Sequence, residues 1–183
     1  MRLRGQNLTN ILLGAIALSY LVQLLVPSYE SRLWISGIDY QNGEYWRLLT
    51  VALVHGGFLH LGFNLYALHL MGTPVELYFG KARYSLILLA GLITGSIASA
   101  LFNDPFTASV GASGMVFGLF GSLAIISERV GIEWRGIIAI VGINFALGFI
   151  LGGIDWRAHV GGLIGGTLMT LLLHRPKQRL SDI

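Results

Sequence analysis

Apolar residues in this chain gather into long stretches that short polar segments separate. Six stretches can be distinguished along the 183 residues, at positions 8–26, 58–77, 82–102, 113–127, 134–151 and 157–173. A helix that crosses a bilayer needs about 20 mostly apolar residues, with a range of roughly 17–25, so most stretches are long enough, while the fourth and sixth are short. Inside lipid every backbone polar group must be hydrogen-bonded within the protein, and a single apolar stretch achieves this as a helix. The pattern therefore predicts an all-α, polytopic membrane protein whose six transmembrane helices form a single domain over residues 1–183.

Composition supports a membrane setting. Hydrophobic residues make up 54% of the chain and charged residues 11%, whereas about a quarter of a soluble domain is charged. The first stretch follows Arg2 and Arg4 as the core of a signal peptide would, but it is longer than such a core and no small-residue cleavage site follows it. We therefore expect a retained helix. The chain has no cysteine, which excludes disulfides and thiolate metal sites.

The basic residues are distributed unevenly between the two sides that six spans define. The net charge of +3 would allow a nucleic-acid partner, but the positions of the basic residues follow the positive-inside pattern of membrane proteins. One side receives nine of them, namely Arg2, Arg4, Lys81, Arg83, Arg129, Arg135, Arg175, Lys177 and Arg179. The other side receives three, namely Arg32, Arg47 and Arg157. We therefore expect both termini in the cytoplasm, a location in the cell membrane (most simply a bacterial plasma membrane) and no nucleic-acid partner.

Four polar residues from three stretches come out at one depth in the membrane. Ser113 and His159 each lie about 15 residues from the inner end of their helix, which at about 1.5 Å per residue places both roughly 22 Å above the inner boundary of a core about 30 Å thick. The same rule places His60 and Asn64 at roughly 27 and 20 Å. Polar groups at such depth are costly, and by default they mark a functional site or line a water-filled cavity.

These residue types fit acyl transfer. A serine hydroxyl is a weak nucleophile that needs an adjacent base, and a neutral histidine is well matched to that role near neutral pH. We expect Ser113 to be the nucleophile and His159 the base. His60 and Asn64, at i and i+4, project from one face of their helix, so they can donate to an oxyanion together with backbone N–H groups at the start of the fourth helix, including that of Ser113.

Other assignments of these polar residues are weaker. Asp155 precedes His159 by four residues and could complete a triad, but it fits the short outer loop better, so we favour a dyad. His60 and His159 would supply only two ligands, since the chain has no thiolate and Asp155 is assigned to the outer loop, so a metal site is poorly supported, and we expect neither a metal nor a cofactor. The G-x-S-x-G motif of soluble hydrolases is not matched, because Met115 occupies the last glycine position.

Two further patterns concern packing within the helices. Gly114 with Gly118, and Gly162 with Gly166, have the small-xxx-small spacing that lets helices approach closely in lipid. Close packing at the second pair would direct His159 at a neighbouring helix. The hydroxyls of three other serines are expected to bond to the backbone of their own helix, as lone helical serines usually do; they are Ser85, Ser96 and Ser99.

Three motifs together resemble the signatures of the rhomboid intramembrane serine proteases. They are the segment 111–114 (Gly-Ala-Ser-Gly), the pair His60-x-x-x-Asn64, and Ala158-His159-x-x-Gly162. The resemblance extends from the Trp46-Arg47 pair to Gly166. It implies a six-helix bundle open to the outer side, in which a serine–histidine dyad cleaves transmembrane segments of other membrane proteins without a metal or cofactor. The implied partners are transmembrane-helix proteins and the lipid bilayer.

The resemblance also assigns individual roles. It implies that Ser113 is the nucleophile, His159 the general base, and His60 and Asn64 the oxyanion side chains. Phe117 stands where many members have a tyrosine that packs on the histidine, and we expect the ring stacking to survive this difference. Four further residues match family positions, namely Trp46, Arg47 and His55 in the outer loop and Glu76 near the inner end of the second helix. Tyr78 stands where a basic residue is often found, which puts an ion pair with Glu76 in doubt.

Two other classes of function stay open at this point. The first is a non-catalytic relative that binds transmembrane clients without cutting them, against which the presence of both Ser113 and His159 argues. The second is a small transporter or channel built around the submerged polar cluster, against which the lack of an internal repeat and of a charged residue at mid-membrane depth argues. The sequence leaves the physiological substrate and the oligomeric state open.

Overall fold

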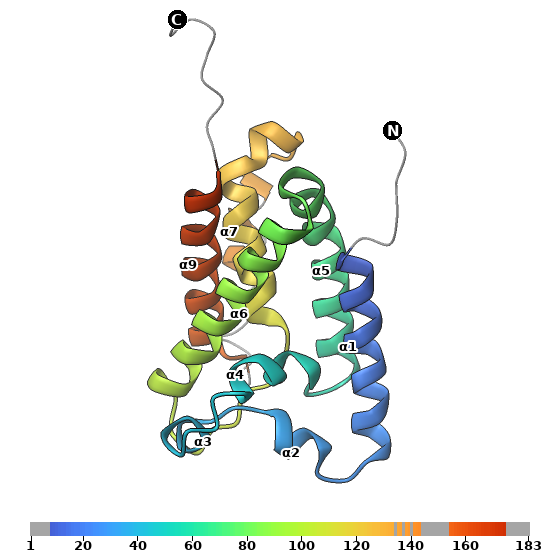
Figure 1. Cartoon of the computed structure of the whole chain (residues 1–183), viewed down its shortest axis with the longest axis vertical. Helices are drawn as coiled ribbons and strands as arrows, with labels where there is room; N and C mark the ends of the chain where they lie inside the picture. The colour runs from blue at the N-terminus through green and yellow to red at the C-terminus, as the bar shows by residue number, and fades with distance from the viewer. Residues whose placement is uncertain (1–7, 134, 137, 140, 144–153, 175–183) are drawn as a thin grey trace, which may run out of the picture.

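The computed structural model describes residues 8–133, 135–136, 138–139, 141–143 and 154–174, and it shows helices joined by loops over these residues, without a strand among them (Figure 1). The named helices are α1 (Leu8–Leu25), α2 (Tyr29–Leu33), α3 (Gly37–Gln41), α4 (Arg47–Thr50), η1 (Val51–Leu53), α5 (Phe58–Phe79), α6 (Lys81–Phe102), α7 (Ser113–Val130) and α9 (Trp156–Leu173). The five long helices, α1, α5, α6, α7 and α9, lie close to five of the six expected stretches; the largest difference is an end at 130 rather than 127 in α7. The stretch 134–151 lies largely outside the described residues.

Several of these helices are suited to crossing a membrane. By length and composition α1, α6 and α7 could each span, and the bent pair formed by Arg47–Leu53 and Phe58–Phe79, with 102° between its parts, would give a fourth span. The protein is all-helical over the described residues and polytopic, as the hydrophobic pattern predicts. The count of six spans and the side of the termini stay predictions.

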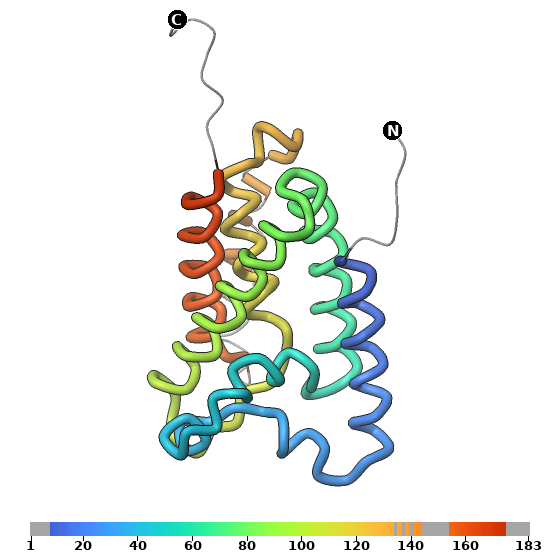
Figure 2. The backbone as a smooth tube through the Cα atoms, viewed as in Figure 1, coloured from blue at the N-terminus to red at the C-terminus, as the bar shows by residue number. Residues whose placement is uncertain are grey.

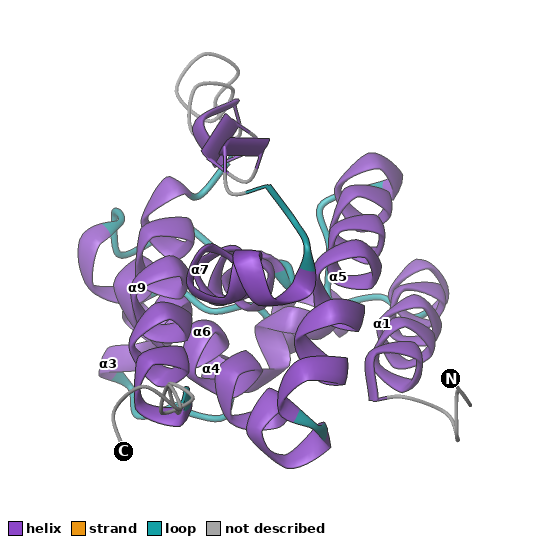
Figure 3. Cartoon of the chain, turned by 90° about the horizontal axis from the view of Figure 1, so that it is seen from above, coloured by secondary structure: helices purple, strands orange, loops and turns teal. Residues whose placement is uncertain are grey.

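Helix α7 is the centre of the bundle. Seen from above, it lies between α5, α6 and α9 (Figure 3). In α7, 67% of the residues of the apolar 18-residue segment are buried inside the protein, whereas in α1 the share is 22%. Leu119, Leu123 and Ile126 of α7 have no exposed surface. By contrast Leu18 and Leu25 of α1 are largely exposed, as is usual for a helix whose outer face meets lipid. The residue that begins α7 is therefore held by the best-packed element of the fold.

Glycines let α6, α7 and α9 approach to backbone contact. A Cβ placed on Gly162 of α9 would lie 2.9 Å from Cα of Gly114 in α7, and one on Gly95 of α6 would lie 3.1 Å from the same atom. Gly166 of α9 faces the backbone of Gly118 in the same manner. The two small-xxx-small pairs of the sequence thus meet each other in one interface, where only glycine fits.

The N-terminal end of α1 is held by a carboxylate from α5. Glu76 is buried, and it accepts hydrogen bonds from the backbone N–H groups of Leu8, at 2.6 Å, and Thr9, at 2.9 Å. The Thr9 hydroxyl donates to the same carboxylate at 2.8 Å and also contacts the Tyr84 hydroxyl at 3.0 Å. The first amides of a helix lack partners within it, and a negative charge there is favourable. Glu76 thus joins α1 to α5. Tyr78, which stands where the family often has a basic residue, contacts Nδ1 of His174 at 3.2 Å.

Short helices and loops gather at one end of the bundle. The chain leaves α1, forms α2, α3 and α4 across this end, and returns through α5 (Figures 1 and 2). Arg47 fixes this segment, since its Nη1 donates to the carbonyls of Ser31 at 2.9 Å and Trp34 at 3.0 Å. Ile35 and Ser109 exchange backbone hydrogen bonds of 3.2 and 2.8 Å. That exchange fastens the loop before α7 to the same segment.

Candidate active site

Ser113 is placed by a tight turn at the start of α7. It is the first residue of the helix, and Gly111 two positions earlier has a φ of +117°, which L side chains rarely adopt. The N–H of Gly111 donates to the Val51 carbonyl at 2.9 Å, and the N–H of Ala112 donates to Nε2 of His55 at 3.4 Å. The serine hydroxyl therefore stands at a helix N-terminus, where the first amides have no partner in the helix and favour negative charge.

The glycine interface brings His159 to the level of this serine. Gly114 directly follows Ser113, and Gly162 comes three residues after His159, so the contact between the two glycines leaves both side chains within about one helical turn of it. A small cavity is lined by Ser113 and Gly114 from α7 and by Ala158 from α9. The first turns of α7 and α9 thus line the same cavity.

The aromatic contact of His159 is with Phe117. Their ring centroids lie 4.0 Å apart and the ring planes differ by 11°, a stacked arrangement. Phe117 comes four residues after Ser113, so both side chains project from one face of α7. The imidazole of His159 therefore packs on the face of α7 that carries the serine, and the stacking expected from the sequence is present.

His60 and Asn64 lie beside the turn that precedes the serine. A Cβ on Gly111 would come within 2.8 Å of Cε1 and Nε2 of His60 and 3.9 Å from Nδ2 of Asn64. Nδ1 of His60 accepts the N–H of Gly56 at 3.3 Å, which leaves Nε2 as the protonated nitrogen of the neutral ring. One N–H of the Asn64 amide donates to the His60 carbonyl at 2.9 Å, and the amide has a second N–H. Both side chains can thus present a donor near Gly111.

His55 takes a larger part in this region than the sequence indicates. It is fully buried, its ring packs edge-on against His60 with centroids 5.1 Å apart, and its Nε2 is the acceptor for Ala112. Burial, and then the charge of His60, lower the pKa of His55 to about 4, so its ring is neutral at neutral pH. The motif around His60 does not indicate this role. His55 lies in the turn between η1 and α5, and only the folded structure brings it to Ala112 in the loop before α7.

Asp155 is directed away from a triad. It caps the N-terminus of α9, where its Oδ1 accepts the N–H of Ala158 at 3.1 Å. Its Oδ2 accepts hydrogen bonds from Ser99 at 2.5 Å, Ser109 at 2.8 Å and Asn103 at 2.9 Å. Burial would raise the pKa of Asp155, but these four hydrogen bonds together hold it below its ordinary value. The carboxylate is thus ionised and engaged with α6 and the loop before α7.

The expectation for the helical serines is correct at one position and wrong at two. The hydroxyl of Ser85 donates to the carbonyl of Lys81 in its own helix. Ser96, however, donates to the Leu48 carbonyl at 3.0 Å, and Ser99 donates to Asp155. Both of these are on the buried side of α6, where a carbonyl or carboxylate from a distant segment is within reach.

The described residues offer little for metal binding. Within the described ranges no group of three or more His, Asp or Glu side chains could hold a metal ion. His60 and His159 come from different helices and do not belong to such a group among the described residues. The arrangement offers a serine hydroxyl, an imidazole and hydrogen-bond donors at the start of a helix, which are the types of group that acyl transfer requires.

Comparisons with known proteins agree with the resemblance seen in the sequence. The family model described as the Rhomboid domain matches residues 42–176. The chain is 46% identical to Rhomboid protease GluP of Bacillus subtilis over 141 residues, which cover 74% of this chain and 27% of that protein. It is 35% identical to Putative rhomboid protease YdcA of the same organism over 164 residues, covering 84% of this chain and 82% of that protein.

A plant relative is similar at the same level. RHOMBOID-like protein 4 of Arabidopsis thaliana is 39% identical over 168 residues, covering 84% of this chain and 41% of that protein. The chain therefore spans less than half the length of two of these three relatives, and about four fifths of the third.

Proposed function

This chain belongs to the rhomboid family, and from that premise we propose that it is an intramembrane serine endopeptidase that cleaves transmembrane segments of other membrane proteins. The observation that carries the proposal is the stack of His159 on Phe117, because Phe117 and Ser113 share one face of α7. This contact favours a base held beside the nucleophile. The relatives GluP and YdcA are named as proteases, which supports the same class of activity.

The proposed reaction uses only side chains and backbone groups of this chain. The hydroxyl oxygen of Ser113 attacks the scissile carbonyl carbon, and His159 takes the hydroxyl proton as general base. Donors from the first turn of α7, with Nε2 of His60 and the second N–H of Asn64, stabilise the oxyanion. His159 then gives its proton to the leaving amine. A water molecule, deprotonated by His159, hydrolyses the acyl-enzyme and releases Ser113.

The proposed setting is the plane of the membrane. With six spans and both termini in the cytoplasm, Ser113 lies roughly 8 Å below the outer face of the hydrocarbon core. A nucleophile at this depth meets peptide bonds of transmembrane helices rather than those of soluble proteins. We place the protein in the cell membrane, most simply a bacterial plasma membrane, with transmembrane-helix proteins as substrates.

The alternative is a non-catalytic relative that binds transmembrane clients. Such a protein needs a surface for helices but has no need of a serine and a histidine on facing helices. The turn at Gly111, whose φ of +117° is rarely adopted by L side chains, and the donors of His60 and Asn64 beside it also favour catalysis, since a binding surface alone does not require them.

A fluorophosphonate probe tests the proposal directly. Purified protein in liposomes is exposed to the probe, and the cleavage of a model transmembrane substrate is measured in parallel. We expect both labelling and cleavage in the wild type, and loss of both in Ser113→Ala. The matched control is Ser127→Ala in the same helix, whose hydroxyl bonds to the Ala124 carbonyl; it should label and cleave like the wild type. A wild type that is neither labelled at Ser113 nor able to cleave would falsify the protease proposal and leave the client-binding alternative.

A further inference from the structure

Asp155 stands where three segments of the fold meet. It directly precedes α9, and the C-terminal end of α6 and the loop that leads into α7 reach it through hydrogen bonds. The end of α6 and the start of α9 lie at the same end of the molecule as α3 (Figure 1). The carboxylate therefore connects the helix that carries His159 to the loop that leads into α7, which begins at Ser113.

The chemistry of the carboxylate suits this connection. Its Oδ2 accepts from Ser99 at 2.5 Å, Ser109 at 2.8 Å and Asn103 at 2.9 Å. An ionised carboxylate is acceptor-only, with about two lone-pair sites on each oxygen, so it can serve several donors at once. An asparagine at this position would keep one acceptor oxygen and replace the other by an NH₂ group, which is a donor. That NH₂ group would face N–H or O–H donors and could not accept their hydrogen bonds. The connection thus depends on the charge of Asp155 as well as on its shape.

Both sides of the connection are anchored in other ways. Ser109 exchanges two backbone hydrogen bonds with Ile35, so its backbone is held in place. On the other side, Oδ1 of Asp155 accepts the N–H of Ala158 at 3.1 Å, while the side chain of Arg157 donates to Oδ1 of Asn103 at 2.7 Å. A hydrogen bond between two anchored groups transmits position, because neither group can move alone.

The spacing along the chain links this bond to the dyad. Ser109 precedes Ser113 by four residues, and Asp155 precedes His159 by four residues. The bond between Ser109 and Asp155 therefore joins points that are equally far along the chain from the nucleophile and from the base. The glycine interface fixes how closely α7 and α9 approach, and this bond fixes how their first turns are set against each other.

We propose that Asp155 is a positioning residue for the dyad, whose hydrogen bond to Ser109 sets the separation and orientation of Ser113 and His159. The inference rests on the proposed protease function. The backbone carbonyl of Asp155 accepts the backbone N–H of His159 at 3.3 Å, while its carboxylate acts through the loop and the helix that it joins. A misplacement of about 1 Å at a reacting pair can cost about 100-fold in rate, so loss of this bond should be seen in the chemical step.

The test compares Asp155→Asn with a matched control. We expect Asp155→Asn to lower kcat and the rate of fluorophosphonate labelling of Ser113 by about 10- to 100-fold, with KM for the model substrate unchanged within about twofold. The control is Asp39→Asn. Asp39 is also a carboxylate at the start of a helix: in the capping box of α3 it accepts the N–H of Ser36 at 2.9 Å and its hydroxyl at 2.6 Å. Its ion pair is with Arg47, at 3.8 Å, rather than with a group of the loop before α7 or of α9. It should lower the Tm and leave kcat unchanged.

A milder variant keeps the test decisive if Asp155→Asn folds poorly. Ser109→Ala removes the same bond from the other side, and it should lower kcat with a smaller loss of Tm. In a protein that carries both changes, the second should cost little more than the first, because both act through one contact. The proposal is overturned if folded Asp155→Asn or Ser109→Ala retains wild-type kcat, or if the control loses as much. A wild type without Ser113-dependent activity would instead contradict the protease function itself.

Discussion

At the scale of single residues, the imidazole of His159 stacks on the ring of Phe117. The two rings stack at 4.0 Å, and Phe117 is buried. An aromatic pair contributes about 0.5–1.5 kcal/mol beyond its buried area. Leucine fills much of the same space but offers no flat face, so we expect Phe117→Leu to lower the rate of Ser113 labelling by about 2- to 10-fold in a protein that still unfolds cooperatively.

The control for this change is Phe117→Tyr, which keeps the ring. It should label within about twofold of the wild type, because the stacking energy of the two rings is similar. Labelling rates are measured with fluorophosphonate at equal concentrations of folded protein. Equal rates for Phe117→Leu and the wild type would show that the stack has no part in orienting His159.

His55 gives the fold a dependence on pH. Its pKa is lowered from 6.5 to about 4 by burial and then by the charge of His60, so the folded state takes up this proton only near pH 4, whereas the unfolded chain takes it up near 6.5. Between these values the unfolded state binds more protons, and the free energy of unfolding falls as the pH falls. This contribution is complete above about pH 6.5 and is lost progressively toward pH 4.

The measurement is chemical unfolding in detergent micelles from pH 4 to 7. His55→Gln has no proton to gain in this window, so its free energy of unfolding should fall less steeply with acid than that of the wild type. The other titrating groups are common to both proteins, and His60 is the one in contact with the substituted ring, so the difference between the two curves reports His55 together with its electrostatic effect on His60. Parallel curves would contradict a neutral, buried imidazole at this position.

At the scale of helices, the glycine interface decides how closely the helices that carry Ser113 and His159 approach each other. A Cβ on Gly162 would meet backbone atoms of Gly114, with Cα at 2.9 Å, and backbone atoms cannot turn aside as a side chain can. We expect Gly162→Ala to push α9 from α7, to destabilise the protein by about 1–3 kcal/mol or more, and to reduce labelling of Ser113.

The matched control is Gly62→Ala on α5, where an added Cβ would meet no atom within 4 Å. Alanine is the better helix former by up to about 1 kcal/mol, so this variant should be as stable as the wild type or slightly more stable. Unfolding curves and labelling rates are recorded for both. If the two alanines behave alike, close approach at Gly162 is not what positions His159.

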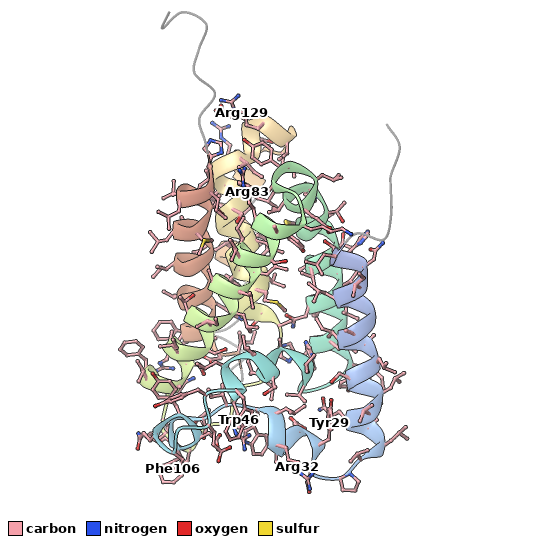
Figure 4. The ribbon with its side chains drawn as sticks, in the orientation of Figure 1. Tyr29, Arg32, Trp46, Arg83, Phe106 and Arg129 are labelled. Carbon is pink, nitrogen blue, oxygen red and sulfur yellow. The ribbon has the colours of Figure 1, made fainter. Side chains whose placement is uncertain are left out.

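At the scale of the whole molecule, charge distinguishes the two ends of the bundle. Arg83 and Arg129 lie at one end, and Arg32 lies at the other end, where Tyr29, Trp46 and Phe106 also lie (Figure 4). The positive-inside pattern assigns the first end to the cytoplasm. The same assignment places the short helices and the start of α7, with Ser113, toward the outer side.

Cysteine labelling tests this orientation, and the chain is suited to it because it has no cysteine of its own. Single variants Arg83→Cys, Arg129→Cys and Arg32→Cys are treated with a membrane-impermeant maleimide in intact cells and in inverted vesicles. We expect Arg32→Cys to react only from outside, and the other two only from inside. Reaction of all three from one side would contradict the topology.

Much of the element scale was accessible from the sequence. The long helices α1, α5, α6, α7 and α9 lie close to the predicted stretches, because an apolar run of this length has one way to satisfy its backbone in lipid. The expectations for Ser96 and Ser99 failed for the converse reason. Their partners, Leu48 and Asp155, are 48 and 56 residues away, and local propensity carries no information about such neighbours.

The candidate site divides in the same way. The residue types and spacing of its three motifs suffice to nominate Ser113, His159, His60 and Asn64, since acyl transfer needs a nucleophile, a base and donors. The resemblance marked His55 as a family position, but its contact with Ala112 was not accessible, because that bond joins positions 57 residues apart. Asp155 was visible as a carboxylate near His159, but its direction depends on where the end of α6 and Ser109 lie.

The sequence by itself determined that this is a polytopic helical membrane protein of the rhomboid family and which residues are candidates for its chemistry. Both follow from local properties: the length of apolar runs, the scarcity of charge, and motifs a few residues long. Only the tertiary structure decided that Gly114 contacts Gly162 and that Phe117 stacks on His159. It likewise decided that Asp155 accepts a hydrogen bond from Ser109 in the loop before α7. These contacts join segments distant in the chain, and which distant surfaces meet is set by the shape and packing of all the helices together.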